Sequence, residues 1–108
     1  MKKLKKYLIH LNESWEITHH ELYEIETSIL SKSNPTIPDE FLDYLVEDLF
    51  QASNTSKGLT LDIGWYPESD SNGEYFLKLI KDSDWTNPMV VLHGRNIEKI
   101  IEKIDGHI

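Results

Sequence analysis

The sequence predicts an α+β fold in a single domain spanning residues 1–108. Three observations predict it. Apolar residues recur every three or four positions in the first half, they alternate with a period of two from Leu59 onward, and the helical period returns at Ile97. Helices and strands that follow one another in blocks are typical of α+β architecture. A length of 108 residues fits one domain rather than two.

The first predicted helix spans residues 19–32. Thr18 and Glu21 have the spacing of a capping box, and the apolar residues that follow recur on one helical face. The proline at position 35 ends this helix, because the residue before a proline avoids helical geometry. The preceding residues 4–15 fit either a helix or a short strand, and both alternatives stay open.

The second predicted helix spans residues 38–52. Pro38 suits the first position of a helix, where Asp39 and Glu40 also place negative charge at the positive end of the helix dipole. The apolar residues of this segment share one face of such a helix: Phe41, Leu42, Leu45, Leu49 and Phe50.

The second half predicts a three-stranded antiparallel meander followed by a helix. Leu59, Leu61, Ile63 and Trp65 alternate with more polar residues, as in a strand with one buried face. A turn-rich segment containing Asn72-Gly73 then separates the first strand from the second. The expected strands are 59–66, 74–81 and 89–93, and the expected helix is 97–104. We expect all three helices to cover one face of the sheet and to leave the other face wet.

Composition excludes several classes of protein. The formal net charge of −8 argues against a nucleic-acid binder, because affinity for phosphates comes from clustered Lys and Arg. The chain has no cysteine, which excludes disulfides and thiolate ligands. Apolar runs are far shorter than the ~20 residues of a membrane span. The basic start is followed by too short an apolar stretch for a signal peptide, so we expect a cytoplasmic protein.

The sequence predicts no catalytic residues, no metal site and no cofactor. The glycines are isolated, and none opens a helix after a parallel strand as a phosphate-binding loop does. His19 and His20 are neighbours that point in different directions on the predicted helix, and no histidine pair has the spacing of metal ligands. Asp62 and Glu74 could approach each other across the hairpin, but nothing distinguishes them as a catalytic pair. We therefore expect a protein without enzymatic activity.

The acidic residues concentrate in the middle of the chain, near aromatic residues. Residues 31–86 contain eleven Asp and Glu against four Lys. Tyr and Trp are frequent anchors of protein interfaces, and complementary charge speeds the approach of a partner. The predicted surface for a basic partner comprises Tyr66, Glu68, Asp70, Asp82, Asp84 and Trp85. The alternative face, on the second predicted helix, comprises Asp39, Glu40, Asp43 and Glu47. For Trp65, on the apolar side of the alternation, we predict burial in the core.

Residues 61–97 contain a distinctive pattern. The hairpin motif Gly-Trp-Tyr-Pro-Glu-Ser-Asp-x-x-Gly runs from Gly64 to Gly73, and the segments Trp-Thr-Asn-Pro (85–88) and Arg-Asn-Ile (95–97) follow it. This pattern resembles that of small bacterial immunity proteins, including those of contact-dependent growth inhibition systems. The N-terminal half carries no comparable similarity.

The resemblance implies a non-enzymatic antidote that acts in the cytoplasm. Such a protein binds the C-terminal toxin domain of a sibling cell's effector. Our main hypothesis is that this chain does so in a tight 1:1 complex, and its composition predicts neither nucleic acid nor membrane as a partner. The toxins of these systems are often nucleases, commonly of RNA. Two alternatives remain: a regulatory or adaptor domain that binds another basic protein, and a small enzyme that uses surface carboxylates.

Overall fold

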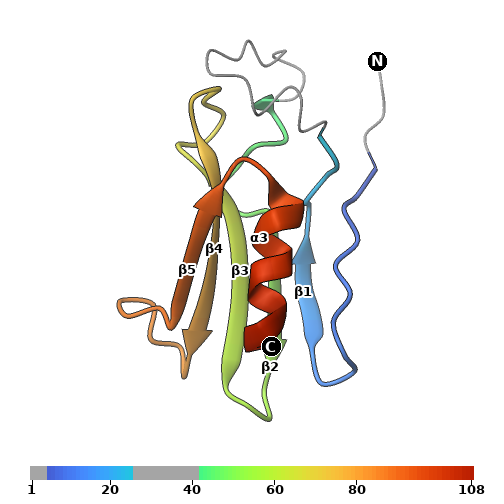
Figure 1. Cartoon of the computed structure of the whole chain (residues 1–108), viewed down its shortest axis with the longest axis vertical. Helices are drawn as coiled ribbons and strands as arrows, with labels where there is room; N and C mark the ends of the chain where they lie inside the picture. Colours follow the sequence, from blue (N-terminus) through green and yellow to red (C-terminus); the bar gives the residue numbers. More distant parts are fainter. Residues whose placement is uncertain (1–4, 26–41) are drawn as a thin grey trace.

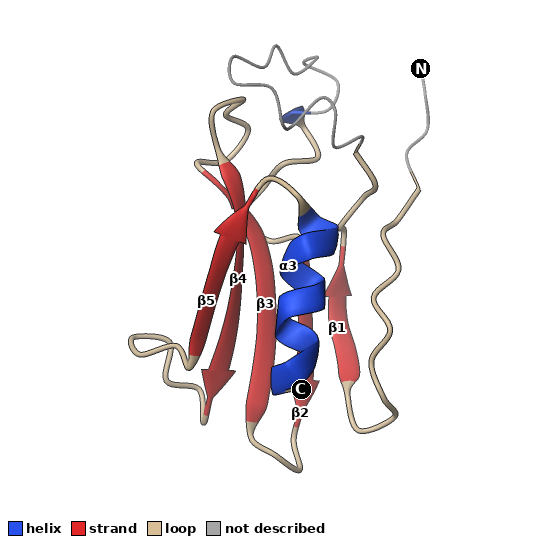
Figure 2. Cartoon of the chain, in the orientation of Figure 1, coloured by secondary structure: helices blue, strands red, loops and turns tan. Residues whose placement is uncertain are grey.

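The computed structural model describes residues 5–25 and 42–108. In this part of the chain, five strands form one antiparallel sheet in the order β1-β2-β3-β4-β5, as Figure 1 shows. The strands are β1 (Glu16–His20), β2 (Phe50–Asn54), β3 (Leu59–Tyr66), β4 (Glu74–Lys81) and β5 (Val90–Gly94). The helix α3 (Ile97–Ile104) and the short 3-10 helix η1 (Asp105–His107) follow the last strand; Figure 2 distinguishes helix from strand.

The longest strands, β3 and β4, form the centre of the sheet. Leu61 lies opposite Leu79 and Ile63 lies opposite Leu77, so the apolar sets of the two strands occupy the same face. This register is fixed by the alternation itself, because a slip of one residue would turn every apolar side chain toward the opposite face. Trp65 continues the apolar row and is fully buried, as predicted.

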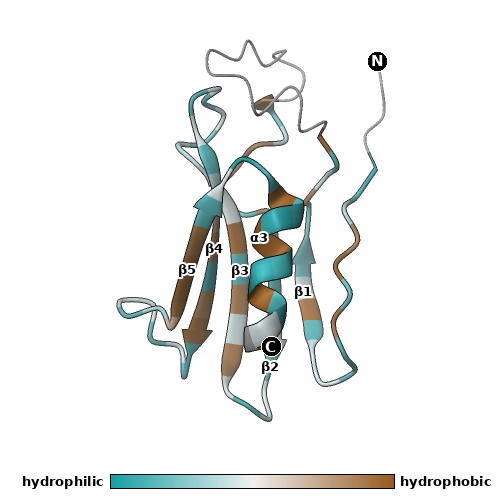
Figure 3. Ribbon diagram, in the orientation of Figure 1, coloured by the Kyte–Doolittle hydropathy of each residue, from teal (hydrophilic) through white to brown (hydrophobic). Residues whose placement is uncertain are grey.

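Helix α3 packs on the apolar face of the sheet. Its N-cap is Asn96, whose side-chain oxygen accepts a hydrogen bond from the backbone N–H of Lys99 at 3.3 Å. Ile97, Ile100 and Ile104 lie at helical spacing and are buried. Figure 3 shows the resulting hydrophobic and hydrophilic stretches alternating along the helix.

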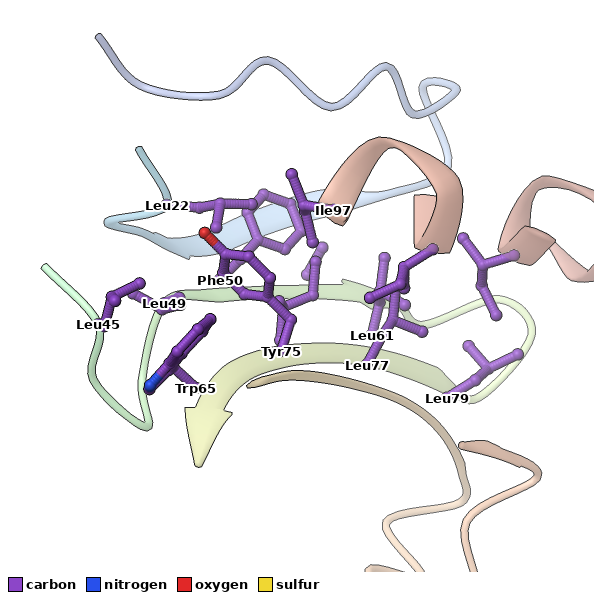
Figure 4. Packing of buried hydrophobic residues seen from close by; sticks show 14 of the residues in the cluster. Leu22, Leu45, Leu49, Phe50, Leu61, Trp65, Tyr75, Leu77, Leu79 and Ile97 are labelled. Carbon is purple, nitrogen blue, oxygen red and sulfur yellow. The ribbon is translucent and has the colours of Figure 1, made fainter. Parts of the chain in front are cut away.

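The core lies between the sheet and the layer formed by α3 and the N-terminal segment. Figure 4 shows side chains of β2, β3 and β4 pointing from the sheet toward this layer. Residues 5–15 add Tyr7, Ile9 and Leu11, which pack partly buried against the same core. Fully buried members of the core include Leu22, Leu45, Leu49, Phe50, Ile63, Trp65, Tyr75, Leu77 and Leu79.

The expected fold class is wrong. The sheet has five strands instead of three, and the described part of the chain has one short C-terminal α-helix instead of a set of covering helices. Residues 16–20 form β1 where the helix over 19–32 was expected to begin, and residues 50–54 form β2 where the second helix was expected to end. The remaining parts of these two predictions, 26–32 and 38–41, lie outside the described residues.

The helical spacing of apolar residues led to a wrong prediction for this segment, because a segment without regular secondary structure can also bury every third or fourth residue. Leu45 and Leu49 are fully buried, yet residues 42–49 form tight turns and a broad bulge. The capping-box pattern at Thr18 has another explanation. Its hydroxyl donates a hydrogen bond to the backbone carbonyl of Gln51 at 3.2 Å, at a bulge in the pairing of β1 with β2.

Neither alternative for residues 4–15 is found among the described residues 5–15. This segment runs along the β1 side of the sheet without forming a helix or a regular strand. Its pairing is limited to an isolated bridge between Lys6 and Tyr23, next to a hydrogen bond from the Tyr7 N–H to the Leu22 carbonyl of 2.7 Å. In the second half, by contrast, β3, β4, β5 and α3 lie at the predicted positions to within one residue.

Candidate functional site

One face of the sheet is not covered by α3. The register places Asp62 and Tyr66 of β3, Phe76 and Lys78 of β4, and His93 of β5 on this side. We call the surface built around these five residues the open face. All five residues retain contact with solvent, whereas the β3 and β4 residues that alternate with them on the other face are buried.

An aromatic row crosses the open face from β3 to β5. The ring of Tyr66 meets that of Phe76 edge-on, with centroids 5.7 Å apart. Phe76 in turn stacks on His93, with centroids 5.4 Å apart and planes inclined by 21°. His93 also places its Nδ1 3.0 Å from a carboxylate oxygen of Glu74. Because each ring belongs to a strand and packs against the next ring, the aromatic row is pre-organised in the unbound protein.

Carboxylates surround the Tyr66 end of this row. Burial raises the pKa of the Tyr66 hydroxyl, and the negative charges of Asp62, Glu47 and Asp48 raise it further. Burial also raises the pKa of Asp62, against the attraction of Lys78. Lys78 Nζ lies 5.6 Å from the centroid of the Tyr66 ring, in the range of a cation–π contact.

A bulge next to Gly64 brings two of these carboxylates onto the open face. The Leu49 N–H donates to the Ile63 carbonyl, and the Trp65 N–H donates to the Val46 carbonyl, so the intervening residues 47–48 bulge out of the ladder. A Cβ at Gly64 would clash with the backbone carbonyl of Glu47 and with the ring of Tyr66. Glycine is therefore required at this position for the bulge to lie against β3.

A hollow of about 340 Å³ adjoins the open face beside β1. Tyr23 and Tyr44 meet edge-on in its wall with centroids 4.8 Å apart. The Tyr23 hydroxyl donates to Glu21 at 2.5 Å, which lowers the pKa of that carboxyl. His19 donates from Nε2 to the Asp48 carbonyl at 2.8 Å, which joins the hollow to the bulge. The lining residues are His19, Glu21, Tyr23, Asp43, Tyr44, Val46 and Asp48.

The six residues predicted to contact a partner do not form one patch. Tyr66, Glu68 and Asp70 lie at the end of the sheet where β3 turns into β4, whereas Asp82, Asp84 and Trp85 lie at the opposite end. The eight residues of β4 separate the two groups by roughly 24 Å, at ~3.4 Å per residue. The two turns therefore flank the sheet from opposite ends.

Two of the predicted acidic residues also hold their own turns. The Asp70 carboxylate accepts from the Asn72 N–H at 2.8 Å, and its backbone carbonyl accepts from the indole N–H of Trp65 at 2.9 Å. The Asp84 carboxylate accepts from the Thr86 hydroxyl at 2.7 Å, and the hydrogen bonds from Thr86 and Asn87 lower its pKa. Asp82 also has a structural contact, since its N–H donates to the Gly58 carbonyl at 2.8 Å.

The alternative face was predicted on a helix that does not continue through the described residues 42–52. Asp43 lines the hollow beside β1, and Glu47 lies on the bulge beside Gly64. Asp39 and Glu40 lie outside the described residues. Of the two described members, Glu47 lies close to Tyr66, the one residue of the first predicted set on the open face.

Sequence reasoning did not single out Phe76, Lys78 or His93. The signal was present, because the period-two alternation that buries Leu77 and Leu79 assigns Phe76 and Lys78 to the opposite face. The pairing of β4 with β5, which brings His93 beside Phe76, depends on register and could not be read from composition. Asp62 and Glu74 do not face each other, since Asp62 lies opposite Lys78 and Glu74 lies opposite Tyr66.

Among residues 5–25 and 42–108, no group of three or more His, Asp or Glu side chains could hold a metal ion. None of the helices described for these residues has the length and apolarity to cross a membrane. The chemistry that the open face offers is recognition, through aromatic surface, carboxylates and one lysine.

Comparison of the chain with models of protein families, with curated proteins and with solved structures finds no match. The resemblance of residues 61–97 to immunity proteins therefore stays a prediction from the sequence motif. In the structure these residues build the β3–β4 hairpin, β5 and the start of α3.

Proposed function

We propose that the chain is an immunity-type protein that binds a basic toxin domain and neutralises it. The toxin would be the C-terminal domain of a secreted effector, and a nuclease acting on RNA fits best. The proposal combines the motif resemblance over residues 61–97 with the acidic net charge of −8. It places the action of the protein in the cytoplasm, where such a toxin would otherwise reach its substrate.

The observation that carries this proposal is the open face with its aromatic row and its border of carboxylates. A nuclease presents a cationic cleft to bind the phosphates of its substrate, and a rigid acidic surface can occupy that cleft in their place. Tyr66 and Phe76 supply anchors of the kind that dominate interface energetics. The proposed mechanism is therefore occlusion in a 1:1 complex, for which an interface of ~1,600 Å² would suffice.

The experiment is co-expression with the toxin domain encoded directly upstream of the gene. We expect growth rescue, co-purification, and an association rate that falls by on the order of tenfold between low and high salt, because screening weakens steering. Growth arrest in the presence of the intact protein would contradict the proposal. Binding with a salt-independent association rate would exclude charge pairing as its basis. Binding to an unrelated basic protein, without protection from the toxin, would favour the adaptor alternative.

A further inference from the structure

We infer that the open face is the surface that contacts the toxin, and that its occupant is a cationic surface with an apolar centre. This inference rests on the proposed function and identifies the surface that would carry it out. It differs from the expectation that the two acidic turns make the contact, because those turns lie at opposite ends of the sheet.

The charge of the open face is one-sided. Within the described residues 5–25 and 42–108, five carboxylates lie on this side against one lysine, Lys78: those of Glu16, Glu47, Asp48, Asp62 and Glu74. The helix on the opposite side is nearly balanced, since Glu98 and Glu102 alternate with Lys99 and Lys103. A basic partner is therefore attracted to one face of this molecule in preference to the other.

The apolar part of the open face lies along β4 and β5, next to the carboxylates. Val91 is 47% exposed and lies opposite Lys78, and Met89 is 57% exposed just before β5. Phe76 is the diagonal neighbour of Val91 in the register of β4 and β5, so these residues give this part of the open face apolar surface beside the charges of β3 and the bulge. An apolar centre with a charged rim is the usual arrangement of a protein interface.

Lys78 marks where a cation binds on this face. Its ammonium group lies over the Tyr66 ring, and Asp62 lies opposite it on β3. The molecule thus already satisfies one cation at this position with its own side chain. An arginine or lysine of the toxin would add a second cation beside it, paired with the carboxylates of Glu47 and Asp48, which no described cation pairs at hydrogen-bond distance.

The test compares two charge reversals of equal size on opposite sides of the sheet. Glu47→Lys with Asp48→Lys changes the open face, and Glu98→Lys with Glu102→Lys changes the exposed side of α3. Each pair moves the net charge from −8 to −4, so long-range attraction to the toxin falls equally. We expect the first pair to weaken binding of a catalytically inactive toxin at least 100-fold and the second less than 5-fold.

A second comparison removes apolar surface. Phe76→Ala should weaken binding at least 30-fold, whereas Leu8→Ala, at a residue 71% exposed on the N-terminal segment, should leave it within 2-fold. Thermal melting of all four variants identifies any that fail to fold. If one of the charge-reversal pairs does not fold, the Phe76→Ala and Leu8→Ala comparison still tests the inference. Equal losses on both sides of the sheet, or a larger loss at α3, would overturn the inference while leaving the proposed function intact. A wild-type protein that does not bind the toxin would refute both.

Discussion

The two faces of the sheet use the same strands for different purposes. On the covered face, Leu61, Leu77 and Leu79 are at most 1% exposed and contact one another beneath α3. Tyr66, Phe76 and Lys78 belong to the same two strands, but they lie on the open face and remain in contact with solvent. Because successive side chains of a strand point to opposite faces, the proposed recognition residues alternate with core residues along β3 and β4. Ile80 is the exception, since it lies on the open side by register and is fully buried. Apart from Ile80, the proposed recognition surface can change without disturbing the core.

The sharpest test of this separation is a pair of truncations on adjacent strands. Leu77→Ala leaves a cavity in the covered face and should lower the free energy of unfolding by about 2–5 kcal/mol. Val91→Ala, on the open side of β5, should cost less than about 1 kcal/mol. Denaturant unfolding of both variants measures the difference. Similar losses would mean that the open face is also part of the folding core, and the comparison would fail.

A smaller effect is expected where the two faces meet, at Gly64. Gly64→Ala forces a methyl group against the Glu47 carbonyl, and we expect a loss of about 1–3 kcal/mol as the bulge shifts. The matched control is Gly106→Ala, since a Cβ there meets no atom within 4 Å. Chemical denaturation measures both, and the Glu47 and Asp48 amide signals report whether the bulge moves. A neutral Gly64→Ala would show that the bulge does not depend on close approach to β3.

The sequence predicted the second half of the fold well because its signal is local. Turn formers and the period of two delimit β3 and β4, and Asn96 caps α3 by a contact three residues away. The first half could not be predicted in the same way. Leu45 and Leu49 reach the core through a bulge whose shape depends on two hydrogen bonds, Leu49 to Ile63 and Trp65 to Val46, between residues 14 and 19 positions apart in the chain.

The candidate site was predicted only in part, for the same reason. Tyr66 was identified from its aromatic character beside acidic residues, and Glu47 from its place in an acidic segment. What brings them together is the pairing of the bulge with β3, a long-range feature. Glu68 and Asp82 are close to aromatic residues in sequence, but the length of β4 separates their turns. The predicted acidic surface is therefore less compact than the closeness of its residues in the sequence suggested.

The smallest expected effect concerns the charge of Asp62, which lies half-buried on the open face. Burial raises its pKa above the ordinary value of 3.8, so the folded protein holds the proton more tightly than the unfolded chain does. The contribution of this group to stability is therefore fully present below pH 3.8 and is lost as the pH rises through the folded-state pKa. Asp62→Asn does not titrate, so the stability of this variant relative to that of the wild type should increase as the pH rises through the folded-state pKa of Asp62.

Denaturant melts of wild type and Asp62→Asn between pH 3 and pH 7 measure this difference. If the stability of Asp62→Asn relative to the wild type decreases as the pH rises, the attraction of Lys78 outweighs burial, and Asp62 is held as a stabilising ion pair. An increase would mean that the open face keeps a carboxylate at a cost to its own stability. Such a cost is expected of a residue retained for binding, because a cationic partner that pairs with Asp62 offsets the burial of its charge in the complex.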